Sequence, residues 1–112
     1  MAAGSPEENR IEDRMLLAEK ALEKYGARPI DINRKNREIL NQRVIYLLNN
    51  VYYRVDHAEF DGKAFVILSC IEDPKYADIG LMEDVEAIPA DASEEEIDRV
   101  IRQALGIGGE TA

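Results

Sequence analysis

The chain has 112 residues and a mass of 12.6 kDa, which suits one domain with a single hydrophobic core. Apolar residues make up 46% and charged residues 33%, and this composition excludes intrinsic disorder and collagen-like repeats. No apolar run approaches the roughly 18 residues of a membrane helix. The one cysteine, Cys70, cannot form an internal disulfide, and the N-terminus has no signal-peptide pattern. We therefore expect a cytoplasmic protein that does not span a membrane.

The net charge of −9 is unevenly distributed along the chain. Residues 28–55 hold six basic and two acidic residues, whereas residues 56–98 hold fourteen acidic residues against two lysines. An acidic block of this size repels phosphate backbones, so DNA and RNA are poor partners. A protein partner with a basic surface fits the charge better, although such acidity also keeps small proteins soluble.

The pattern predicts a disordered tail over residues 1–4, one α+β domain over residues 5–106 and a frayed tail over residues 107–112. Ser5 is suited to cap a first helix from Pro6 to Tyr25. Its apolar positions recur at steps of four and three, which is the spacing of a buried helical stripe. Gly26 follows where a left-handed helix end is common.

The segment after Asn33 is open to two interpretations. Leu40, Val44, Leu47, Leu48 and Val51 fit a 3.6-residue period and favour a second helix capped by Asn33, with Arg34, Lys35, Arg37 and Arg43 on the solvent side. Alternatively, residues 44–48 form a strand, and Asn49-Asn50 turns the chain into Val51. We prefer the helix, although short apolar runs do not decide between the two.

Asp61-Gly62 predicts a type I′ hairpin between strands at 52–60 and 63–72. A two-residue turn places Phe60 opposite Lys63, and it fixes every pair back to Tyr53 opposite Cys70. The second strand is apolar on both faces, which is typical of a central strand.

A third strand is expected over residues 79–88, with a bulge or bend at Glu83-Asp84, where the alternation breaks, and an end at Pro89. Ser93 and Glu96 form a capping box for a last helix that ends before Gly106. The predicted order is α-α-β-β-β-α, with the helices on one face of a three-stranded antiparallel sheet. The sheet has four strands if residues 44–48 are extended.

The acidic half of the chain offers the main candidate site. We expect the edge of the sheet and the loop after the hairpin to bind a basic protein surface through Glu72, Asp73, Asp78, Glu83, Asp84 and Glu86. These carboxylates match neither the ligand spacing of an EF-hand nor that of a zinc site, so we expect no metal and no cofactor. The basic stretch lacks the interleaved aromatic residues of a nucleic-acid site.

Two residues suggest chemistry. His57 lies on the same predicted face as Glu59, and this pair is the alternative hypothesis, a small acid-base enzyme. Cys70 is expected to be an inert core thiol on the central strand. Ala58, Phe65 and Ile67 give the other sheet face an apolar patch, so we expect a homodimer that covers this face or pairs an open strand.

Overall fold

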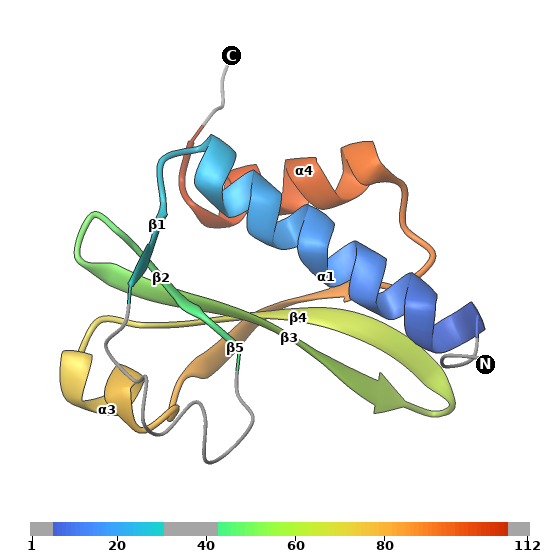
Figure 1. Cartoon of the computed structure of the whole chain (residues 1–112), viewed down its shortest axis with the longest axis horizontal. Helices are drawn as coiled ribbons and strands as arrows, with labels where there is room; N and C mark the ends of the chain where they lie inside the picture. Colours follow the sequence, from blue (N-terminus) through green and yellow to red (C-terminus); the bar gives the residue numbers. More distant parts are fainter. Residues whose placement is uncertain (1–5, 31–42, 108–112) are drawn as a thin grey trace.

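A computed structural model describes residues 6–30 and 43–107 of the chain, and it forms a five-stranded antiparallel sheet with two long helices on one face (Figure 1). Neighbours along the chain are neighbours in the sheet, in the order β1-β2-β3-β4-β5. The helices are α1 (Pro6–Lys24), α3 (Pro74–Asp78) and α4 (Glu94–Ala104), and the strands are β1 (Arg28–Ile30), β2 (Ile45–Leu48), β3 (Val51–Phe60), β4 (Lys63–Ile71) and β5 (Glu83–Pro89). In the described residues, no helix is long and apolar enough to cross a membrane.

The α+β class is confirmed, but the sheet is larger than predicted. The preferred helix at residues 44–48 is wrong, because Ile45–Leu48 is strand β2 and pairs with β3. Asn49 and Asn50 both have positive φ, at 52° and 67°, and form the tight turn of the alternative interpretation. The proposed cap Asn33 and the apolar Leu40 lie outside the described residues.

Burial on both faces explains why the pattern of β2 was ambiguous. Ile45 and Tyr46 are adjacent in a strand and point to opposite sheet faces, yet their exposed fractions are 0% and 6%. Two covered faces remove the alternation that normally marks a strand. Antiparallel pairing with β2 places Ile30 of β1 opposite Ile45.

The β3–β4 hairpin has the predicted register. Phe60 pairs with Lys63, and the ladder continues to Tyr53 opposite Cys70. Asp61 and Gly62 have φ values of 53° and 75°, as the type I′ turn requires. β4 lies between β3 and β5 in the sheet, which confirms its central position.

The third predicted strand is shorter than expected. β5 begins at Glu83 rather than residue 79, because residues 74–78 form the short helix α3 and the chain turns before pairing with β4. The register shifts between Leu68, opposite Glu86, and Ser69, opposite Asp84. Val85 is therefore the extra residue of a bulge, one position beyond the predicted Glu83-Asp84 break. Pro89 is the last residue of the strand.

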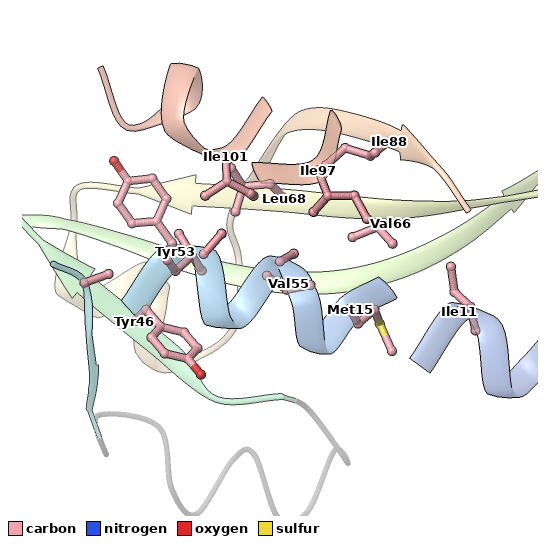
Figure 2. Packing of buried hydrophobic residues seen from close by; sticks show 14 residues of the cluster. Ile11, Met15, Tyr46, Tyr53, Val55, Val66, Leu68, Ile88, Ile97 and Ile101 are labelled. Atoms are coloured by element: carbon pink, nitrogen blue, oxygen red, sulfur yellow. The ribbon is translucent and has the colours of Figure 1, made fainter. Parts of the chain in front are cut away.

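The core lies between the sheet and the two long helices (Figure 2). The predicted stripe of α1 is confirmed, and Ser93 caps α4 by accepting a hydrogen bond from the Glu96 amide at 3.1 Å. In Figure 2, Ile97 and Ile101 point from α4 to the sheet. The buried apolar cluster consists of Ile11, Met15, Ala18, Ala21, Leu22, Ala27, Tyr46, Tyr53, Val55, Val66, Leu68, Ile88, Ile97 and Ile101.

Hydrogen bonds and ion pairs link α1 and the residue after it to Arg43, which precedes β2, and to α4. Arg43, expected on a solvated helix face, instead donates two hydrogen bonds to Glu19 at 2.9 and 3.1 Å, and lies 3.4 Å from Glu12. At the other end of the helix, Asp98 of α4 accepts from the Tyr25 hydroxyl at 2.6 Å and from Lys24 at 3.1 Å. The Tyr25 hydrogen bond, aided by Lys24, lowers the pKa of Asp98.

α3 covers part of the sheet face opposite the long helices. Its Ala77 is fully buried, and Ile67 and Ser69 on that face are buried too. The Arg54 guanidinium donates to the Gly80 carbonyl oxygen at 3.1 Å and so holds the loop after α3 against the sheet. This face, called the α3 face below, is thus only partly open to a partner.

Candidate functional site

β5 is a terminal strand with a free side. Among the described residues it pairs only with β4. The Ala90 amide donates to the Ala64 carbonyl oxygen at 3.0 Å, and in an antiparallel ladder every second residue along β5 then faces β4 in the same way. Ile88 is two residues from Ala90 and faces β4, so the backbone polar groups of Ala87 and Pro89 point to the free side.

Carboxylates stand on both faces of this strand. Glu83 and Glu86 lie opposite Cys70 and Leu68, on the face that carries the long helices. Asp84 lies opposite Ser69 on the α3 face, and its Oδ1 accepts a hydrogen bond from the Ser69 hydroxyl at 2.7 Å. Because of the bulge at Val85, Glu86 lies on the same face as Glu83 rather than on that of Asp84. We call Glu83, Asp84 and Glu86 the acidic edge.

The other three predicted carboxylates lie around α3. Asp73 caps this helix, its Oδ1 accepting from the Lys75 amide at 2.9 Å. Asp78 is the half-buried last residue of the helix, and Glu72 is exposed beside Cys70. Three of the six predicted residues therefore lie on β5 and three lie around α3, and the six do not form one cluster. No group of three His, Cys, Asp or Glu in the described ranges is arranged to hold a metal.

A groove beside the acidic edge was not predicted from the sequence. Its volume is about 260 Å³, and its lining residues are mostly apolar and include Asp84 and Glu86 of the acidic edge. Phe60 and Val85 are exposed by 56% and 43%, and the Phe60 ring lies 5.7 Å from that of Phe65. The lining residues are Phe60, Ile67, Asp84, Val85, Glu86 and Ala87. The sequence placed Phe65 and Ile67 on an apolar face, but it did not give the register of the third strand beside them.

A second hollow lies between α1 and α4, and its lining carries three acidic and three basic residues. It has a volume of about 660 Å³ and is lined by Lys24, Glu94, Glu95, Asp98, Arg99 and Arg102. Lys24 is paired with Asp98, and Arg99 forms an ion pair with Glu96 on its own helix. The Lys24–Asp98 pair links the two helices, and the lining has no net charge, whereas the acidic edge carries three carboxylates.

His57 and Glu59 share the long-helix face, as the register predicted. Both are exposed, and neither lines the groove or the hollow described above. The Asp56 carboxylate accepts a hydrogen bond from the His57 backbone amide at 2.8 Å and not from its ring. Acid-base catalysis requires an oriented pair within reach of a bound substrate, so this arrangement offers little support for the enzymatic alternative.

Cys70 is half-buried rather than fully buried, a correction to the expected core position. It packs against the rim of the core and lies opposite Tyr53. Burial raises the pKa of the Cys70 thiol, and the nearby charges of Glu83 and Glu72 raise it further. A raised pKa keeps the thiol protonated at neutral pH and makes it a poor nucleophile.

The reactivity of Cys70 should therefore depend on its acidic neighbour. At pH 8 we expect a thiol reagent to label Cys70 more slowly than a free thiol, with a rate that rises as the pH approaches the raised pKa. Glu83→Gln removes one negative charge, so it should lower the pKa of Cys70 and speed labelling. Glu95→Gln on α4 is the matched control. Labelling that is as fast as that of a free thiol, and insensitive to Glu83→Gln, would contradict this description.

Comparisons with known proteins give no family for this chain. No protein-family model, no curated protein and no solved structure matches it.

Proposed function

We propose that this chain is a non-enzymatic interaction protein that binds a basic surface of another protein through the acidic edge. The observation that carries the proposal is the terminal strand β5, which pairs on one side only within residues 6–30 and 43–107 and carries carboxylates on both faces. Negative charge continues from the acidic edge to the region around α3, which carries Glu72, Asp73 and Asp78. The single cysteine fits action in a reducing compartment such as the cytoplasm.

Electrostatics favours a cationic partner over a second copy at this edge. Two β5 strands side by side would bring like charges together, and charged residues on edge strands commonly prevent such pairing. Lysine and arginine side chains would instead compensate the carboxylates and accelerate encounter. The homodimer expected from the sequence remains a prediction for the α3 face, which α3 partly covers.

The test is affinity capture from the native cell with three tagged forms of the chain. The first is the wild type, and the second, the edge variant, carries Glu83→Gln, Asp84→Asn and Glu86→Gln. The Asp84→Asn change keeps a side-chain oxygen that can accept the Ser69 hydrogen bond, so folding should be preserved. The third, the control variant, carries Asp13→Asn, Glu59→Gln and Glu95→Gln. It loses the same charge at exposed positions elsewhere.

Quantitative mass spectrometry should show basic proteins that the wild type and the control variant retain equally. The edge variant should retain them at least about tenfold less, because three surface ion pairs of ~0.5 kcal/mol each sum to about 1.5 kcal/mol. Equal losses in both variants would mean that net charge alone governs capture. Unchanged capture by the edge variant would place any interaction surface elsewhere.

A further inference from the structure

We propose, resting on the function above, that the partner binds as an extended segment that adds a strand to β5. In this mode an apolar residue of the partner lies opposite Ala87, and lysines or arginines flank it. Strand addition is a common way for an extended peptide to bind an open sheet edge. The proposal depends on three features of this edge: its free backbone groups, its groove and its charges.

The alternating direction of the backbone N–H and C=O groups along β5 determines where a partner strand can pair with it. Ile88 and Glu86 lie in the positions that face β4, whereas Ala87 presents its N–H and C=O to the free side. Pro89 also faces the free side but has no N–H to donate. The bulge at Val85 interrupts the ladder in the other direction. Ala87 is thus the position at which a partner strand can exchange both backbone hydrogen bonds.

The groove determines which side chain the partner carries at that position. Side chains of directly opposed residues lie on the same face of a sheet, so the residue opposite Ala87 projects on the α3 face. There the apolar side chains of Phe60, Ile67 and Val85 line the groove, and Phe60 and Val85 are exposed in it. An apolar side chain there removes this exposed apolar surface from water, which favours binding.

The charges determine the flanking residues. The two partner residues beside the apolar one project on the opposite face, one next to Glu86 and the other next to Ile88, and Glu83 stands on that face beyond the bulge. Asp84 adds a carboxylate at the rim of the groove. A segment in which basic and apolar residues alternate therefore satisfies both faces of β5 at once. A second copy of β5 would offer carboxylates at these same places.

The probe is a fluorescent peptide of about ten residues in which lysine and valine alternate, with both ends blocked. Its affinity for the full chain is measured by anisotropy at low salt. Ala87→Pro removes the outward N–H without removing a hydrogen bond to β4, a position where a sheet tolerates proline. Ala87→Val keeps the N–H and is the matched control. Loss of one net hydrogen bond should weaken binding about fivefold to tenfold in Ala87→Pro, and less than about twofold in Ala87→Val.

A second measurement keeps the test independent of how Ala87→Pro folds. A peptide with one N-methylated valine at its centre cannot donate to the Ala87 carbonyl oxygen, and it should bind the wild-type chain several-fold more weakly than the parent peptide. Replacing the valines by serine should also weaken binding, because the groove is then left unfilled.

The outcomes separate this proposal from the proposed function. If the edge variant weakens binding while Ala87→Pro and the N-methylated peptide bind as well as their parents, strand addition is wrong and the acidic edge stands. If the edge variant also binds normally, both fail. If the wild type does not bind the alternating peptide at all, strand addition fails, and the capture experiment judges the function alone.

Discussion

Replacing Leu68 by alanine is expected to lower the free energy of unfolding by about 3 to 4 kcal/mol. Leu68 is fully buried on β4, the strand between β3 and β5, and Figure 2 places it close to Ile101 of α4. Its removal would leave a cavity between sheet and helix that neither layer can close, since both are held by other contacts. Domains of this size have total stabilities of about 5 to 15 kcal/mol, so the loss should be conspicuous.

Chemical denaturation followed by circular dichroism measures this effect. Leu81→Ala is the control, because Leu81 is 61% exposed in the loop before β5 and should change the stability by less than about 0.5 kcal/mol. A loss below about 1 kcal/mol for Leu68→Ala would contradict the position of Leu68 in a tightly packed core. A similar loss for the two variants would contradict the burial of Leu68 and the exposure of Leu81.

Local signals predicted the parts of the fold that depend on local physics. Asp61-Gly62 has one favoured turn geometry, and the register from Phe60 to Tyr53 follows from that turn alone. Ser93 and the apolar stripe of α4 define a helix in the same way. In these segments the chemistry of a few neighbouring residues is sufficient.

The β2 segment was mispredicted because its burial depends on distant neighbours. Ile45 is buried on the α3 face and Tyr46 against the long helices, so both positions are apolar for different reasons. A continuous apolar run of this kind fits a helix as well as a doubly covered strand. Strand β1 was not predicted for a related reason. The three residues Arg28–Ile30 form a strand only because β2 is extended beside them.

The sequence predicted which acidic residues belong to the candidate site, but not how they are arranged in space. The sequence shows that carboxylates are numerous in the acidic half, yet it does not assign them to faces. That assignment depends on the bulge at Val85, which reverses the face between Asp84 and Glu86. Predicting the groove likewise requires the β4–β5 register, because this register brings Ala87 beside Ile67. It also requires the position of β3, because Phe60 lines the groove from that strand, on the other side of β4.

The edge variant should associate with the lysine-valine peptide much more slowly than the wild type. Charge steering raises association rates by about 10-fold or more when a concentrated field attracts an oppositely charged ligand. The field of the acidic edge extends far at low salt, where the Debye length is ~30 Å at 0.01 M, and is screened as this length falls to ~10 Å at 0.1 M. The control variant has the same net charge as the edge variant, so it isolates the position of the charges.

Stopped-flow association rates for the three forms across this salt range test the acidic edge most directly. The wild type and the control variant should both associate fast at ~0.01 M and slow steeply with added salt. The edge variant should start about tenfold lower and depend little on salt. Rates and salt slopes that are the same for the edge and control variants would contradict recognition of a basic partner by Glu83, Asp84 and Glu86.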